Sequence, residues 1–157
     1  MGDSRRFDLF ADLSLCSIPL QVHIADVAGG KGGLQAALYL RGFTDVTSWD
    51  IRKKYAKDRR GYRFGRFNWR TSEKYDAVLA MHPDDATDHV ILYAATHHIP
   101  ALVCPCCTRP SAVQYEGNTD YPSWVEHLMW LAWEHGASIR KTFLPMGGAS
   151  SVLMINL

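Results

Sequence analysis

The sequence lacks the features that mark membrane proteins and disulfide-rich proteins. No apolar run approaches the ~20 residues of a membrane-spanning helix, and no signal-type hydrophobic stretch follows the first residues, Met-Gly-Asp-Ser-Arg-Arg. Four cysteines, three of them crowded into positions 104–107, are too few for a disulfide scaffold. Repeats and low-complexity linkers are also missing. We therefore expect one soluble cytoplasmic domain, residues 1–157, with reduced thiols and no membrane partner.

The formal net charge of +1 hides an uneven distribution of charge along the chain. Residues 52–70 hold nine of the 17 Lys and Arg but only one of the 16 Asp and Glu, a local charge of +8. Aromatic residues are interleaved with these cations: Tyr55, Tyr62, Phe64, Phe67 and Trp69. Cations that neutralise phosphates, next to rings that stack on unpaired bases, are typical of single-strand nucleic-acid binding. The alternative is the charged outer face of an edge strand.

Hydrophobic periodicity predicts an alternation of strands and helices. Apolar runs predict strands at 22–27, 45–51, 62–69, 75–81 and 100–105. Helical spacing and end signals predict helices at 34–43, 84–98 and 121–136. Residues 138–145 and 150–157 flank Met-Gly-Gly-Ala and predict a closing hairpin. The pattern indicates an α/β fold with a mostly parallel seven-stranded sheet and a C-terminal antiparallel hairpin.

A glycine-rich turn, Asp26-Val-Ala-Gly-Gly-Lys-Gly-Gly, follows the first predicted strand. Doubly wound sheets bind ligands at this position, where backbone N–H groups approach an anionic group closely. A P-loop would need Ser or Thr after Lys31, which Gly32 excludes, and Gln35 stands where a dinucleotide fingerprint needs a small residue. The glycines could also build only a tight strand-to-helix turn.

The remaining pattern, an acid followed by alternate glycines, resembles that of class I S-adenosylmethionine-dependent methyltransferases. Asp26, Gly30 and Gly32 match it, and Ala28 replaces the first glycine. The resemblance implies a Rossmann-like fold with S-adenosyl-L-methionine as the cofactor. It implies that the turn holds the methionine moiety and that Asp50 binds both ribose hydroxyls. By the same carry-over Asn68 and Trp69 would contact adenine, and Met81 would line the cofactor site.

A second resemblance covers residues 79–107. This segment is similar to the methyltransferase domain of glutathione S-transferase C-terminal domain-containing proteins and to relatives that act on tRNA. It carries His82, then Ala86-Thr87-Asp88, then Cys-Pro-Cys-Cys at 104–107, although Pro83-Asp84 departs from the relatives' Ala-Cys-Gly. The resemblance implies RNA as the substrate class. If the basic segment binds that RNA, Arg59, Arg60, Arg63 and Arg66 are its expected phosphate contacts.

The same architecture would bring His82, Asp84, Cys106 and Cys107 to the transferred methyl group. His82 is the candidate base, because histidine titrates near neutrality; the alternative is a packing or capping residue. Asp84 could equally favour a helix N-terminus. The cysteines could be buried thiols, a nucleophile or metal ligands, and because Cys-Pro-Cys-Cys lacks zinc-site spacing we expect no metal.

These observations predict an S-adenosylmethionine-dependent methyltransferase that acts on nucleic acid, with RNA favoured. Two alternatives stay open at this stage: a small-molecule methyltransferase, and a non-catalytic S-adenosylmethionine-binding subunit of a larger complex. The sequence does not determine the oligomeric state or the methylated atom.

Overall fold

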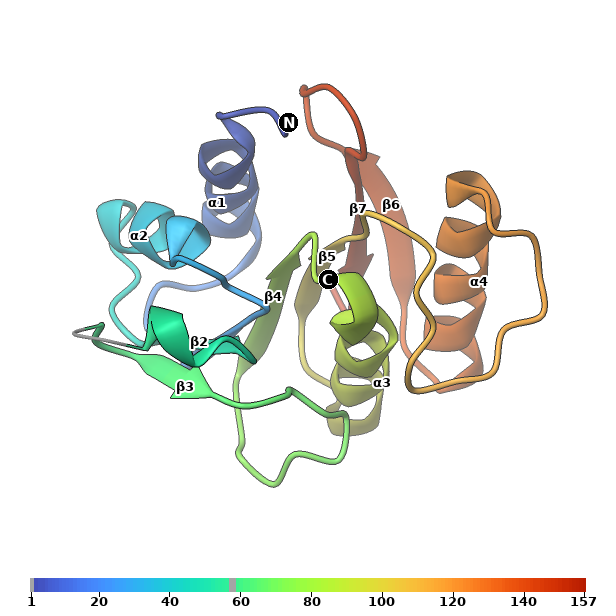
Figure 1. Cartoon of the computed structure of the whole chain (residues 1–157), viewed down its shortest axis with the longest axis horizontal. Coiled ribbons are helices and arrows are strands. Elements are labelled where there is room, and N and C mark those ends of the chain that lie inside the picture. Colours follow the sequence, from blue (N-terminus) through green and yellow to red (C-terminus); the bar gives the residue numbers. More distant parts are fainter. Residues whose placement is uncertain (1, 57–58) are drawn as a thin grey trace.

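A computed structural model describes residues 2–56 and 59–157 and shows a seven-stranded sheet with helices on both faces (Figure 1). Its helices are α1 (Arg6–Ser17), α2 (Gly33–Leu40), α3 (Thr87–His97) and α4 (Tyr121–Glu134), with short 3-10 turns η1 (Lys53–Tyr55) and η2 (Asp84–Ala86). Its strands are β1 (Ile24–Val27), β2 (Val46–Asp50), β3 (Tyr62–Phe64), β4 (Ala77–Met81), β5 (Ala101–Cys104), β6 (Ile139–Phe143) and β7 (Ser151–Ile155).

The strand order is β3-β2-β1-β4-β5-β7-β6, and β7 alone runs against its neighbours. The predicted mostly parallel sheet with a C-terminal antiparallel hairpin is confirmed. Strands β1, β4, β5 and β7 are buried along their whole length, as expected for strands covered on both faces. Successive strands are added in one direction from β1 to β3 and in the other direction from β4 onward, so the order of strands reverses between β1 and β4. The carboxyl ends of β1, β2 and β4 therefore border a crevice of the kind where ligands bind in such sheets.

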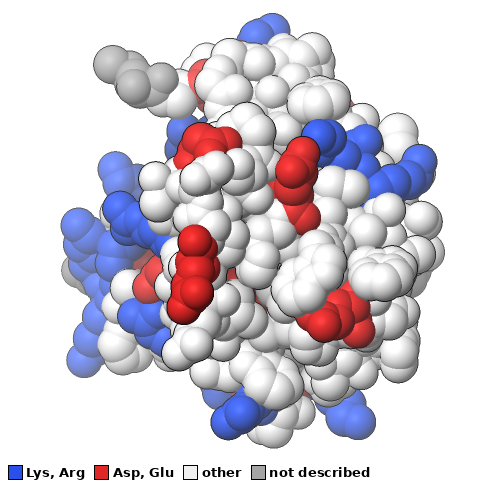
Figure 2. Space-filling model, turned by 90° about the vertical axis from the view of Figure 1, so that its right-hand side faces the viewer, with Lys and Arg blue, Asp and Glu red and all other residues white. Residues whose placement is uncertain are grey.

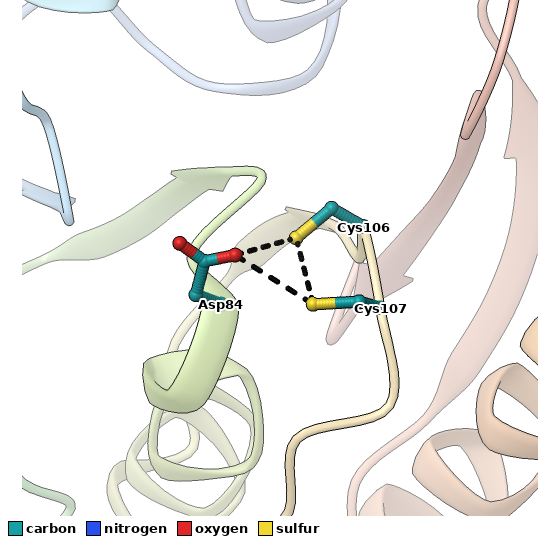
Figure 3. A group of neighbouring side chains, drawn as sticks. All are labelled: Asp84, Cys106 and Cys107. Atoms are coloured by element: carbon teal, nitrogen blue, oxygen red, sulfur yellow. Dashed lines mark hydrogen bonds between the residues drawn. The ribbon is translucent and has the colours of Figure 1, made fainter. Parts of the chain in front are cut away.

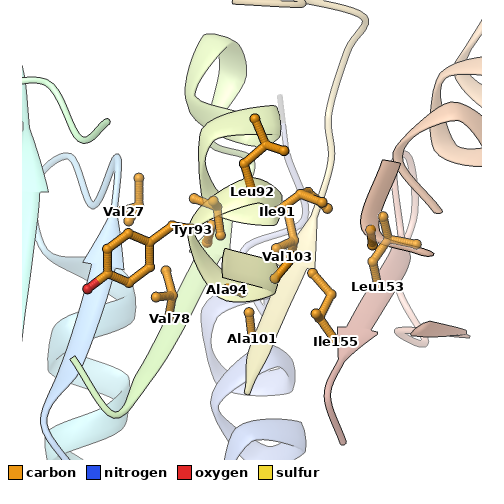
Figure 4. Packing of buried hydrophobic residues seen from close by; sticks show 14 of the residues in the cluster. Val27, Val78, Ile91, Leu92, Tyr93, Ala94, Ala101, Val103, Leu153 and Ile155 are labelled. Atoms are coloured by element: carbon orange, nitrogen blue, oxygen red, sulfur yellow. The ribbon is translucent and has the colours of Figure 1, made fainter. Parts of the chain in front are cut away.

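Two hydrophobic clusters hold the layers together. One joins α1 and α2 to one face of the sheet and includes Phe10, Leu38 and Leu79, all fully buried. The other joins α3 and α4 to the opposite face through residues such as Val78, Ile91 and Trp124 (Figure 4). Helix α1 is absent from the sequence prediction, which reads the segment before residue 22 as a polar start, although seven of its twelve residues are apolar. Its packing against α2 therefore belongs to the tertiary structure.

Strand β3 is shorter than predicted. It ends at Phe64, because Gly65 adopts a positive φ of 152° and Phe67 then turns into the core. There Phe67 packs edge-on between Trp49 and Tyr93, at ring-centroid distances of 5.6 and 5.1 Å. The alternation of aromatic residues in 62–69 thus reflects a short edge strand followed by a core anchor. The predicted helix at 84–98 is likewise split into η2 and α3.

Candidate active site

The glycine-rich turn begins directly after β1 and is fastened to the end of β2. The N–H of Gly29 donates to the carbonyl of Trp49 at 3.0 Å, and that of Gly32 donates to the carbonyl of Gly29 at 2.9 Å. A side chain at Gly29 would overlap the side chains of Ser48 and Asp26. Ala28, which replaces the family's first glycine, nevertheless holds a left-handed conformation with φ 60°. The turn keeps the shape that glycine favours although one glycine is missing.

Asp26 lies beneath this turn with 1% of its surface exposed. Ser48 Oγ donates a hydrogen bond to its Oδ2 at 2.9 Å. Burial raises the pKa of Asp26 to about 6, and the Ser48 hydrogen bond and the nearby Arg59 guanidinium oppose this rise. Asp26 therefore supports the turn from within, and its carboxylate contacts the turn's neighbours and not solvent.

Arg59 is a structural clamp on the turn. Its guanidinium donates to the carbonyl of Gly30, to Ser48 Oγ at 2.6 Å and to Gln35 Oε1 at 3.0 Å. A side chain at Gly32 would collide with it. Three of the five N–H groups of Arg59 are thus used inside the fold, which leaves less of its guanidinium for the predicted phosphate contact.

Asp50 ends β2 and faces the turn with 4% of its surface exposed. Its carboxylate accepts the N–H of Gly30 at 2.8 Å, and Arg52 donates to both oxygens, from Nε at 2.8 Å and from Nη2 at 2.9 Å. Burial raises the pKa of Asp50, but the Arg52 hydrogen bonds and the Gly30 N–H together bring it below the ordinary value. Asp50 is thus an ionised acceptor at the edge of the crevice.

Two hollows meet at this point and share Ala28 and Arg52. The first, of about 250 Å³, is lined by side chains that include Trp49, Asp50, Phe67 and Asp84, and we call it the Asp50 hollow. The second, of about 400 Å³, is the Gly-rich hollow, and its lining is drawn from the turn and from α1 and β4: Arg6, Phe7, Asp26, Gly30, Met81 and His82 among others. The sequence analysis missed Arg6 and Phe7 altogether, and it named Arg52 and Phe67 only as parts of the basic segment and not as residues of this crevice.

Asn68 and Trp69 line neither hollow. Asn68 accepts the N–H of Arg70 in an exposed turn, and Trp69 packs against the core while its N–H meets His89 Nδ1 at 3.3 Å. The structure therefore does not bring Asn68 and Trp69 to the hollow that Asp50 lines; the wall of that hollow comes from Gly65, Arg66 and Phe67, just before them in the chain. The predicted strand runs to residue 69, whereas β3 ends at Phe64, so the residues that follow the strand come earlier in the chain than expected.

Three further arginines of the basic segment point outward. Arg63 pairs with Glu73 and stacks over Trp49, and Arg66 Nη1 contacts Asp85 Oδ2 at 2.6 Å. The side chain of Arg60 is exposed and makes no ion pair with the residues that the structure describes. Two members of the segment, Lys57 and Asp58, lie outside the described residues. The segment therefore contains arginines that bond within the crevice, Arg52 and Arg59, and cations that are exposed.

His82 follows β4 in a left-handed conformation, with φ 55°. Its Nε2 lies 2.9 Å from the carbonyl oxygen of Ala149, in the loop between β6 and β7. A carbonyl only accepts, so Nε2 is the donor in this hydrogen bond. The ring is thereby oriented at the border of the Gly-rich hollow.

Asp84, Cys106 and Cys107 come together although 22 residues separate the first two (Figure 3). Cys106 Sγ lies 3.2 Å and Cys107 Sγ 3.6 Å from Asp84 Oδ1, and the two sulfurs are 3.5 Å apart. Burial raises the pKa of Cys106, and the hydrogen bond to Asp84 raises it further. By themselves these groups hold a neutral Cys106 thiol, which disfavours the nucleophile interpretation. Cys104 is fully buried in the core.

Asp88 explains part of the Ala-Thr-Asp motif. It is fully buried, and its Oδ2 accepts the N–H groups of Ser111, Ala112 and Val113 at 2.7, 2.7 and 3.2 Å. These three residues belong to the long connection that carries Cys106 and Cys107 from β5 to α4. Asp88 is therefore an anchor for the loop beside the candidate site.

Comparison with known proteins defines the fold. No family model and no curated protein matches the sequence. A ribosomal protein L11 methylase from Lactobacillus delbrueckii subsp. bulgaricus is 16% identical and superposes over 99% of this chain and 79% of its own, with a TM-score of 0.70. A SAM-dependent methyltransferase from Aquifex aeolicus is 11% identical over 99% of this chain and 94% of its own, with a TM-score of 0.59.

Fibrillarin from Aeropyrum pernix, solved with natively bound S-adenosyl-L-methionine, is 11% identical over 95% of this chain and 76% of its own, with a TM-score of 0.62. At such identities the likeness concerns architecture, and it agrees with the strand order and the reversed strand β7. The chain has the Rossmann-like α/β fold of S-adenosylmethionine-dependent methyltransferases.

Proposed function

We propose that this protein is an S-adenosylmethionine-dependent methyltransferase. The observation that carries the proposal is the pair of hollows that meet at Ala28 and Arg52, at the carboxyl ends of the strands. Their volumes, about 250 and 400 Å³, together suit a ligand with two halves. Structures of the same fold include methyltransferases and one that holds this cofactor. The resemblance of the Asp26–Gly32 turn to the family supports the same assignment.

Each hollow offers groups that match one half of the cofactor. Trp49 and Phe67 give the Asp50 hollow aromatic surface for adenine, and the buried carboxylate of Asp50 accepts the two ribose hydroxyls. The Gly-rich hollow places the turn backbone and Arg6 around the methionine moiety, where the cation pairs with its carboxylate. Arg52 is half exposed, so it is the donor that a ribose diol displaces from Asp50.

His82 serves as the base or orienting group for the methyl acceptor. The Ala149 carbonyl holds Nε2 as the donor and leaves Nδ1 to accept a proton. Met81 joins it on the wall of the Gly-rich hollow. His82→Ala should lower turnover by ~100-fold or more with nearly unchanged cofactor affinity. Lost affinity with normal turnover would instead make His82 a residue of the cofactor pocket.

We infer that the methyl acceptor is a nucleic acid, with RNA favoured. The basic segment carries exposed cations, including Lys53, Arg60, Arg66 and Arg70, together with the exposed ring of Phe64, and Arg66 also lines the Asp50 hollow. Figure 2, a view of the α4 side, shows a group of Lys and Arg at its left edge and further Lys and Arg at the upper right and the bottom, with acidic side chains nearer the middle. The narrower resemblance to tRNA-acting relatives in residues 79–107 points the same way. The proposal keeps RNA contacts for Arg60, Arg63 and Arg66.

A small-molecule acceptor is the second candidate. It is favoured by the ion pairs that Arg63 and Arg66 make with Glu73 and Asp85, which occupy part of the basic surface. Structures of similar fold also include a mitomycin 7-O-methyltransferase, of which this chain covers 53%.

Calorimetry with S-adenosylhomocysteine tests the cofactor assignment. Asp50→Ala should weaken binding by ~1.5 to 3 kcal/mol, because hydrogen bonds to a charged group are lost. An analogue without the ribose hydroxyls should bind wild type and Asp50→Ala equally, so the double-mutant cycle separates the ribose contact from damage to the turn. Asp45→Ala, at an exposed position just before β2, is the control and should bind both ligands as wild type does. Absence of binding at millimolar ligand would overturn the proposal.

A further inference from the structure

The group formed by Asp84, Cys106 and Cys107 is assembled by the topology of the sheet. Strands β4 and β5 are parallel neighbours whose last paired residues are Met81 and Cys104. The chain leaves both strands at the same edge, so the loop after β4 meets the loop after β5 (Figure 3). One carboxylate and two thiols thereby face one another. Both kinds of group are common ligands of divalent metals.

The separations between the three donor atoms match those around a zinc ion. They are 3.5 Å between the sulfurs, 3.2 Å from Cys106 Sγ to Asp84 Oδ1 and 3.6 Å from Cys107 Sγ to the same oxygen. Tetrahedral zinc, with bonds of ~2.3 Å to sulfur and ~2.0 to 2.2 Å to oxygen, separates neighbouring donors by ~3.5 to 3.8 Å. The three atoms therefore occupy three corners of such a tetrahedron with shifts of a few tenths of an ångström.

The donor types select the metal. Two thiols and one carboxylate favour zinc or a similar borderline cation, whereas magnesium and calcium prefer sites built from oxygen alone. Among the described residues, this is the group of three or more His, Cys, Asp or Glu whose ligand atoms all lie within 4.8 Å of one another. Three protein ligands leave the fourth corner for water or substrate, as in catalytic rather than structural zinc sites.

We propose that Asp84, Cys106 and Cys107 form a three-ligand binding site for Zn²⁺ at the edge of the crevice. This differs from the expectation drawn from the sequence, where Cys-Pro-Cys-Cys alone lacks zinc spacing. The fold supplies the missing ligand from a different strand end. Asp84 also lines the Asp50 hollow, so the three ligands lie beside the proposed cofactor site. Zinc binding does not depend on the proposed methyltransferase function.

Metal titration of the reduced, chelator-treated protein tests the site directly. Zn²⁺ should bind with one-to-one stoichiometry, and Co²⁺ used as a probe should show thiolate-to-cobalt charge-transfer absorption. Cys106→Ser, Cys107→Ser and Asp84→Asn should each weaken binding by more than ~100-fold, since loss of even an outer partner of a metal site costs ~10- to 100-fold. Cys16→Ser, which changes an exposed thiol on α1, is the matched control and should bind as wild type does.

Thiol alkylation followed by mass spectrometry gives a readout on the wild-type chain that does not depend on the folding of any variant. Zn²⁺ should protect Cys106 and Cys107 from alkylation and leave Cys16 reactive. Binding that Asp84→Asn leaves unchanged, equal alkylation of all exposed thiols with and without Zn²⁺, or no binding at micromolar Zn²⁺ would each overturn the proposal. The metal titration and the alkylation contain no methyl donor, so a negative result in them leaves the cofactor proposal intact. Equally, failure of the calorimetric test with S-adenosylhomocysteine leaves the zinc proposal intact.

Discussion

At the residue scale, Asp26 shows how the glycine-rich turn is supported at a cost in stability. Its carboxylate is buried, has one side-chain partner in Ser48, and has a pKa of about 6 in place of the usual 3.8. A raised pKa means that the folded chain binds a proton more tightly than the unfolded chain does. The charge therefore destabilises the fold fully above pH 6, and this cost disappears as the pH falls from 6 toward 4.

We predict that Asp26→Asn is more stable than wild type at pH 8, by at most about 3 kcal/mol for a shift of about two pH units. The advantage should vanish near pH 4, because both proteins are then neutral at this position. Asp50→Asn should behave in the opposite way, since the lowered pKa of Asp50 contributes stability above its unfolded pKa that is lost in acid. Urea unfolding across this pH range measures both; a difference that does not change with pH would contradict the prediction for Asp26.

At the scale of elements, the connection from β5 to α4 depends on a side chain of α3. It contains no regular helix or strand between Cys104 and Tyr121, and Asp88 holds it by three backbone N–H groups. One buried carboxylate thus replaces the hydrogen bonds that secondary structure would supply. The position of the Cys106–Cys107 loop follows from this anchor as well as from the end of β5.

Asp88→Ala is expected to lower the free energy of unfolding by about 1 to 3 kcal/mol, because it leaves three partly buried backbone donors without this acceptor. Asp88→Asn keeps an oxygen that can face the loop and should lose less. Urea unfolding gives the stability, and the alkylation rate of Cys107 reports on the loop itself. Equal losses in the two variants would mean that side-chain packing, and not hydrogen bonding, holds the connection.

The helix α4 presents one tryptophan to the core and two to the surface. Trp124 is fully buried against α3, whereas Trp130 and Trp133 are 48% and 69% exposed. The three tryptophans are spaced over more than one helical face, so they cannot all face the core.

At the scale of the whole molecule, the charge pattern separates RNA from small-molecule acceptors. Arg60 is exposed and is thus available to a phosphate, whereas Arg59 is spent on the glycine-rich turn. Binding of single-stranded RNA should weaken with salt, and the slope of log affinity against log salt should be ~0.7 per phosphate neutralised. Arg60→Gln should reduce the magnitude of this slope by ~0.7, the amount expected for one lost phosphate contact.

Arg140→Gln, an exposed change on the distant strand β6, is the control and should leave the slope as it is. Arg59→Gln should instead lower stability and cofactor affinity, because the clamp on the turn is lost. Fluorescence anisotropy at several salt concentrations gives the slopes. Binding that does not respond to salt would favour the small-molecule acceptor.

The sequence by itself determined the alternation of strands and helices, the reversed last strand and the glycine-rich turn with Asp26 and Asp50 at two strand ends. These features depend on local periodicity and on residues close in the chain, which a sequence shows directly. The sequence did not show that Arg59 bonds to the glycine-rich turn, or that residues 65–67 and not 68–69 line the Asp50 hollow. Each depends on which partner a side chain meets across the fold.

Only the tertiary structure decided that α1 contributes Arg6 and Phe7 to the Gly-rich hollow, and that Asp84 meets two cysteines from the next strand in the sheet. Parallel strands place the ends of distant segments side by side, so donor atoms far apart in sequence become neighbours without any spacing motif. Spacing rules find ligands within a single loop. A site shared between two strand ends becomes visible only when the sheet order is known.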